Sequence, residues 1–88
     1  MADALRDVVV AALNKATGVL NEPEMARQIL SGADVAFADL DLDSLTMFEM
    51  IMEIEEQLGI EMNLDAVAEA KGLDEVVAYL RAGGHGGG

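Results

Sequence analysis

LDLDSLTMFEMIMEIEEQL, residues 40–58, decides the fold, because it joins an acidic loop to a long and unusually apolar helix. Apolar residues recur at helical three- and four-residue spacing from Ser44 to about Leu58, and Gly59 follows as a terminator. Ser44 lies at the junction, directly after Asp43. The stretch therefore predicts a helix that carries one serine at its N-terminal end.

The apolar residues of this helix fall on two lines when each residue turns the helix by about 100°. The first line predicts the core face and comprises Met47, Ile51, Ile54 and Leu58, with Met50 beside it. The second line lies roughly 130° away. It comprises Leu45, Phe48 and Met52, with Glu49, Glu55 and Glu56 around it and Asp43 at the helix start. An apolar line edged by acids is typical of an interface, so we predict a partner surface here, with a wider core as the alternative.

The rest of the chain predicts further helices and no strand. We expect helices over residues 3–16, 22–30 and 73–82, a short helical turn over 65–70, and an irregular connection over 33–43 anchored by Phe37. In the helix over 22–30, the side chains of Met25, Ile29 and Leu30 are expected to face inward. The predicted fold is all-α, a small four-helix bundle whose long first connection contains the short extra helix. The predicted domain spans residues 1–82, and the glycine-rich tail, 83–88, is expected to be disordered.

Composition narrows the classes of partner. Seventeen acidic residues against five basic ones give a net charge of −12, and no Lys or Arg occurs between Arg27 and Lys71. Such a chain is a poor ligand for nucleic acid or anionic membrane and a good one for basic protein surfaces. No signal peptide or apolar run of membrane-spanning length is visible, so we expect a cytoplasmic monomer. The chain has no cysteine and hence no thiol of its own.

Ser44 has a simple explanation and a chemical one. A serine after aspartate at a helix start commonly satisfies the free amide groups of the first turn. A catalytic serine would need a base, and the sole histidine of the chain, His85, lies in the glycine-rich tail. We therefore predict that the chain is not an enzyme and that any chemistry at Ser44 depends on the active site of another protein.

A calcium loop is the alternative suggested by the acidic cluster. Asp39, Asp41 and Asp43 have the spacing of the first three EF-hand ligands. The glycine expected at the sixth position is Ser44, and the glutamate expected at the twelfth is Met50. Weak divalent-cation binding remains possible under this pattern, but no dedicated metal site is predicted.

From residue 35 to residue 80 the chain resembles the acyl carrier protein and peptidyl carrier protein family. Asp43-Ser44-Leu45 matches the Asp-Ser-Leu signature at the start of that family's second main helix, and the resemblance continues to the segment VVAYL at 76–80. The resemblance implies a 4′-phosphopantetheine arm, attached to Ser44 from coenzyme A by a phosphopantetheinyl transferase, with Asp43 and Leu45 beside it. The arm's thiol would hold acyl or aminoacyl groups as thioesters.

The resemblance also implies where partner enzymes bind. The implied contact residues are Leu45, Phe48, Glu49, Met52, Glu55 and Glu56. The implied partners are the transferase, an acyl- or aminoacyl-loading ligase, and downstream synthase or transferase enzymes with basic docking surfaces. The pathway would be fatty-acid, polyketide, nonribosomal-peptide or related biosynthesis. Asp41 replaces the family's usual glycine, and the first connection is longer than usual, which suggests a specialised stand-alone member. The alternatives are an unmodified acidic adaptor and a weak cation-binding protein.

Overall fold

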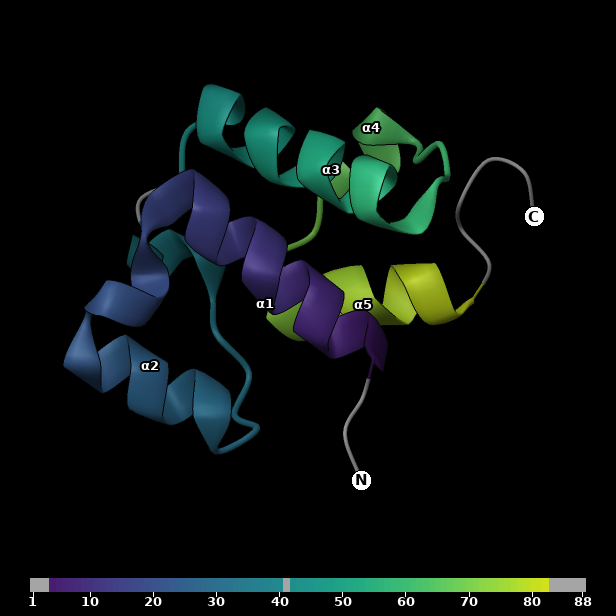
Figure 1. Cartoon of the computed structure of the whole chain (residues 1–88). Helices are drawn as coiled ribbons and strands as arrows, with labels where there is room; N and C mark the ends of the chain where they lie inside the picture. The colour runs from purple at the N-terminus through teal and green to yellow at the C-terminus, as the bar shows by residue number, and fades with distance from the viewer. Residues whose placement is uncertain (1–3, 41, 83–88) are drawn as a thin grey trace.

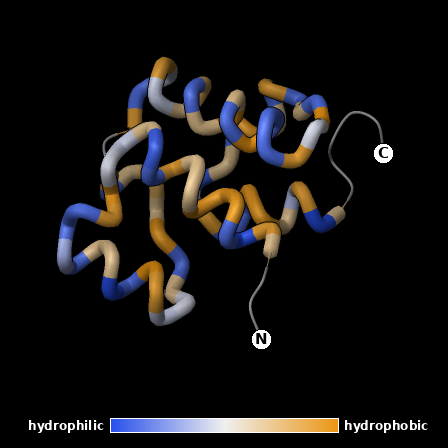
Figure 2. Tube along the Cα trace, viewed as in Figure 1, coloured by the Kyte–Doolittle hydropathy of each residue, from blue (hydrophilic) through white to orange (hydrophobic). Residues whose placement is uncertain are grey.

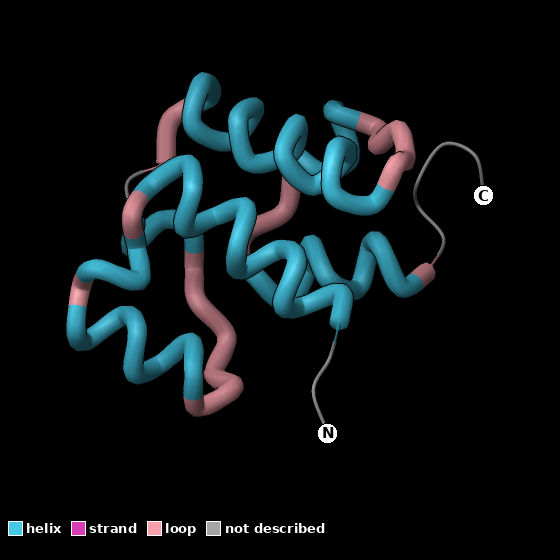
Figure 3. The backbone as a smooth tube through the Cα atoms, viewed as in Figure 1, coloured by secondary structure: helices cyan, strands magenta, loops and turns pink. Residues whose placement is uncertain are grey.

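The computed structural model describes residues 4–40 and 42–82, and these residues form helices joined by short loops (Figures 1 and 3). Five α-helices and two 3-10 helices lie within the described ranges. In chain order they are α1 (Ala4–Thr17), η1 (Val19–Asn21), α2 (Pro23–Leu30), η2 (Phe37–Leu40), α3 (Ser44–Leu58), α4 (Leu64–Ala68) and α5 (Leu73–Arg81). The predicted all-α class is confirmed.

Helix α1 is the centre of the packing, with α3 along one side of it and α5 along the other (Figure 1). The buried side chains of α1 are Val9, Ala12 and Leu13, which follow the three- and four-residue spacing of one helical face. They meet buried residues of α3 and of α5, where Leu73, Val76, Val77 and Leu80 face inward. Figure 2 shows apolar and polar residues alternating along the helices, as packing on one face requires.

Helix α3 matches its predicted bounds, Ser44–Leu58. It ends at Gly59, whose left-handed backbone (φ 65°) lets its N–H donate to the Glu55 carbonyl at 2.8 Å. Met50, Ile51 and Ile54 are buried, whereas Met47 and Leu58 are only half-buried. The predicted core line is thus confirmed at its centre, and its first member, Met47, has one side open.

The connection between α1 and α3 carries the extra helix. Phe37 is buried and anchors the connection, as predicted. The Arg6 guanidinium of α1 donates to the carbonyls of Ile29 (2.9 Å) and Ala33 (2.8 Å), which ties the end of α2 to the bundle. The inward orientation predicted for Leu30 is wrong, since its side chain is 80% exposed. Neighbouring residues on a helix point about 100° apart, so the face that buries Ile29 leaves Leu30 outside.

The connection is also joined to the start of α5. The Phe37 N–H donates to the Lys71 carbonyl at 2.8 Å, and the Leu73 N–H donates to the Val35 carbonyl at 2.9 Å. Gly72 lies at this junction, and a Cβ there would come within 2.8 Å of the Val35 carbonyl oxygen. The approach of the two backbones therefore requires glycine at this position.

Candidate functional site

Ser44 begins α3 but does not cap it. Asp43 is the N-cap residue, and its carboxylate accepts a hydrogen bond from the Thr46 N–H at 2.8 Å. This bond, together with a hydrogen bond from the Thr46 side chain, holds the pKa of Asp43 below its ordinary value. The Ser44 side chain is exposed, and no hydrogen bond in the described part of the chain engages its hydroxyl. The simple explanation of Ser44 as a cap is therefore wrong, because Asp43 fills that role.

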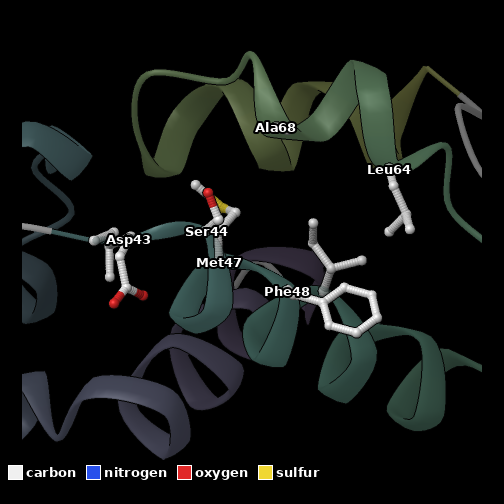
Figure 4. A pocket seen from close by; sticks show the side chains of 8 residues that line it. Asp43, Ser44, Met47, Phe48, Leu64 and Ala68 are labelled. Carbon is white, nitrogen blue, oxygen red and sulfur yellow. The ribbon is translucent and has the colours of Figure 1, made fainter.

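A groove opens beside Ser44, between α3 and α4, and we call it the Ser44 groove. It has a volume of about 240 Å³ and is lined by Leu42, Asp43, Ser44, Met47, Phe48, Ile51, Leu64 and Ala68. Figure 4 shows Leu64 and Ala68 on the side opposite Ser44, Met47 and Phe48. Apart from Asp43 and Ser44, the lining side chains are apolar. The groove therefore suits an apolar chain whose attached end lies at the serine hydroxyl.

The second apolar line of α3 is at the surface. Leu45 is 64% exposed, Met52 51% and Phe48 43%, although Phe48 also lines the Ser44 groove. Large apolar side chains left open in a row mark an interaction surface more often than isolated ones do. The alternative of a wider core is wrong for these three residues. Their role in binding partners stays a prediction.

The four glutamates of α3 divide into two pairs. The Glu55 carboxylate is half-buried and accepts the Met62 N–H at 2.8 Å, so it holds the turn that follows the helix. Glu53 accepts from Lys15 at 2.9 Å and from Gln57 at 2.8 Å. By contrast, Glu49 and Glu56 are exposed, and no ion pair among the described residues engages them. Of the three predicted partner-binding acids, Glu49 and Glu56 are thus the most available, while Glu55 also has a structural role.

The ion pair between Lys15 and Glu53 links α1 to α3. The hydrogen bonds from Gln57 and from Lys15 hold the pKa of Glu53 below its ordinary value, and the same bond to Glu53 raises the pKa of Lys15. The pair keeps both groups charged at neutral pH. Lys15 also lines a shallow surface pocket together with Glu49 and Glu56.

Some of the predicted site features lie outside the residues that the structure describes. Residues 4–40 and 42–82 contain no group of three or more His, Asp or Glu side chains that would suit a metal ion. Asp41 lies outside these ranges, so both weak cation binding by Asp39, Asp41 and Asp43 and the effect of the missing glycine stay predictions. The tail, 83–88, with His85, lies outside them too. None of the described helices combines the length and hydrophobicity needed to cross a bilayer.

Comparison with known families gives a match over nearly the whole described chain. Residues 4–80 match the family described as "Phosphopantetheine attachment site". The chain belongs to this family. The family's prosthetic group is 4′-phosphopantetheine, which is covalently attached, so the family and the cofactor predicted from the sequence are confirmed.

One curated relative carries the name "Acyl carrier protein" and comes from Trieres chinensis. It is 41% identical to this chain over 44 residues, which cover 50% of this chain and 55% of the relative. The chain thus spans about half the length of the curated relative that it matches. No solved structure matches the chain.

Sequence reasoning missed the wall of the Ser44 groove. Leu42, Leu64 and Ala68 line it, and none was predicted as a site residue. On α3, however, the groove is lined by Ser44, Met47, Phe48 and Ile51, which are the positions i, i+3, i+4 and i+7 of one helical face. That spacing is visible in the sequence and could have indicated that Ser44 shares a face with apolar residues.

Proposed function

We propose that the chain is a carrier protein that holds acyl or aminoacyl groups as thioesters on 4′-phosphopantetheine attached to Ser44. The main support is the Ser44 hydroxyl, which is exposed, free of capping duty and at the edge of an apolar groove. When bound, the prosthetic group supplies the thiol that this cysteine-free chain lacks. In this role the chain is not itself an enzyme.

Attachment at Ser44 requires another active site, because no hydrogen bond among the described residues joins the hydroxyl to a base, and the adjacent Asp43 carboxylate accepts from Thr46 instead. The Ser44 oxygen bonds to the phosphorus that carries the pantetheine part of coenzyme A, and adenosine bisphosphate leaves. The serine proton passes to a base of the transferase. The product phosphodiester lies at the N-terminal end of α3, where the helix dipole and free amide groups favour an anion. Asp43 opposes this attraction in part, since its carboxylate stays charged at neutral pH.

Partner enzymes dock on the exposed side of α3 in this proposal. Leu45, Phe48 and Met52 supply the apolar centre of the contact, and Glu49 and Glu56 supply charge for Arg or Lys side chains. Long-range attraction speeds the encounter, whereas three partly exposed apolar side chains bury little area and keep each complex short-lived. We propose the transferase, a loading ligase and downstream synthase or transferase enzymes as partners, and a monomeric, cytoplasmic carrier.

The test is to incubate the protein with coenzyme A and a broad-specificity phosphopantetheinyl transferase and to record the intact mass. The expected result is the gain of one phosphopantetheine, which Ser44→Ala abolishes. The chain offers a matched control in its other serine, Ser31, which is exposed at the end of α2 and donates to the Gln28 carbonyl. Ser31→Ala should be loaded like the wild type. Loading that persists in Ser44→Ala would overturn the assignment.

The alternatives make different predictions in the same experiment. An unmodified acidic adaptor would gain no mass while still binding basic proteins through α3. A cation-binding protein would gain no mass, and calorimetry would detect calcium binding that changes its stability.

The cargo determines which biosynthetic pathway the carrier serves. We propose that the cargo is an acyl group, because the lining of the Ser44 groove is apolar. With a volume of about 240 Å³, the groove is small, so we propose a short chain.

A further inference from the structure

A second groove begins where the Ser44 groove ends, and we call it the Lys71 groove. Its volume is about 610 Å³, and its lining residues are Ala36, Phe37, Ala38, Leu42, Met47, Ala68, Ala70 and Lys71. Leu42, Met47 and Ala68 line both grooves. The two spaces therefore adjoin at these side chains, and Met47 is half-buried with an unbranched, flexible side chain that can move aside.

The lining of the Lys71 groove has an unusual composition. Four of its residues are alanines, which leave room between the connection before α3 and the connection before α5. Among the described residues that line it, Lys71 alone is charged, although the chain carries a net charge of −12. The Lys71 side chain is exposed, and no ion pair within the described residues engages its ammonium. The Glu75 carboxylate accepts a hydrogen bond from the backbone N–H of Lys71 at 3.0 Å.

The position of Lys71 beside the groove is fixed by the backbone. Its carbonyl accepts the Phe37 N–H at 2.8 Å, and Ala36 pairs with Gly72 in an isolated bridge. These hydrogen bonds hold the backbone of Lys71 at the part of the lining that the Ser44 groove does not share, and they leave its ammonium free to bind a ligand. An apolar groove with a lysine in its lining is complementary to an apolar chain that ends in an anion.

We propose that the Lys71 groove receives the distal end of the cargo and that the preferred cargo is an acyl chain ending in a carboxylate. This inference rests on the proposed function, since the cargo must first be tethered at Ser44. The apolar middle of the chain passes Met47, and the terminal carboxylate pairs with the Lys71 ammonium. A neutral acyl chain would fill the Ser44 groove equally well but would gain nothing from Lys71.

The experiment compares two cargoes of equal length on the intact protein. The transferase loads acyl-phosphopantetheine from coenzyme A whose thiol carries either an octanedioyl group or its monoamide, which has the same shape and no charge, and intact mass confirms each product. Hydroxylamine then cleaves the thioester, and the rate of cleavage is measured. A cargo held at both ends exposes its thioester less often, so the carboxylate cargo should be cleaved about threefold more slowly, the effect of an exposed ion pair. Amide resonances of Ala38, Ala70 and Lys71 should shift with the carboxylate cargo alone.

Two variants complete the test. Lys71→Gln should remove the difference between the cargoes, and Arg27→Gln, which removes the same charge from the distant helix α2, should preserve it. Equal cleavage rates for both cargoes on the wild type, or a difference that persists in Lys71→Gln, would overturn the inference and leave the carrier function intact. Failure to load either cargo would overturn the proposed function and this inference with it.

Discussion

The exposed face and the core face of α3 are expected to have different roles, and truncating one side chain on each face tests this. Phe48 is 43% exposed, so just over half of its surface is covered. Full burial of such a side chain contributes about 1.5–3 kcal/mol, so the covered part contributes about 1–2 kcal/mol. Alanine also favours the helix by up to about 0.5 kcal/mol over phenylalanine. We therefore expect Phe48→Ala to lower the free energy of unfolding by about 1 kcal/mol.

The matched core variant lies six residues further along the same helix. Ile54 is 0% exposed and lines neither groove, so Ile54→Ala should cost about 2–5 kcal/mol. Urea denaturation followed by circular dichroism measures both values. Under conditions where both variants are folded, the rate of loading by the transferase should fall about tenfold in Phe48→Ala, equivalent to about 1.4 kcal/mol of contact energy, and stay unchanged in Ile54→Ala. A loss of 3 kcal/mol or more in Phe48→Ala, with normal loading, would show that Phe48 belongs to the core.

Three further predictions concern charge and capping. The lowered pKa of Asp43 means that its stabilising effect is complete above the ordinary value of 3.8 and is lost as pH falls through the folded-state value. The melting temperatures of wild type and Asp43→Ala should therefore converge as pH drops from about 6 to about 3, and a constant gap would contradict this capping role. Asp34→Ala should cost about 1–2 kcal/mol in urea denaturation, because its carboxylate accepts the Asp74 N–H at 2.9 Å in the first turn of α5; an unchanged midpoint would refute that role. Added sodium chloride should raise the melting temperature of the wild type, since it screens repulsion within a chain of net charge −12, and a flat response would show that this repulsion is negligible.

The sequence predicted the helices well because their signals are local. The start of α3 at Ser44 and its end at Gly59 follow from adjacent residues, and the buried face follows from helical spacing. Apart from the orientation of Leu30 and the cap at Ser44, which are local errors, the failures involve contacts between distant residues. The acceptor for the first turn of α5 comes from Asp34, 40 residues earlier, and the structural role of Glu55 depends on the turn at Met62. No local pattern announces either contact.

The candidate site was predicted only in part for the same reason. Ser44 and the exposed line of α3 could be found from residue types and periodicity. The two grooves could not, because their walls combine α3 with α4 and with the connections before α3 and α5. Lys71 illustrates the difference. In the sequence it is one lysine that ends an acidic stretch, and only the backbone contact with Phe37 brings it to the end of a space that begins at Ser44.

The order Asp43 then Ser44 explains how one helix end can serve both structure and attachment. Because Asp43 caps α3, Ser44 becomes its first helical residue, and the side-chain hydroxyl is released from the backbone. The helical register then places Met47, Phe48 and Ile51 on the same face as Ser44 and along the same groove. Phe48 lies at the edge of this face, so it touches both the groove and the exposed line that begins at Leu45. A partner that contacts Phe48 is therefore positioned to sense or to alter what the groove holds.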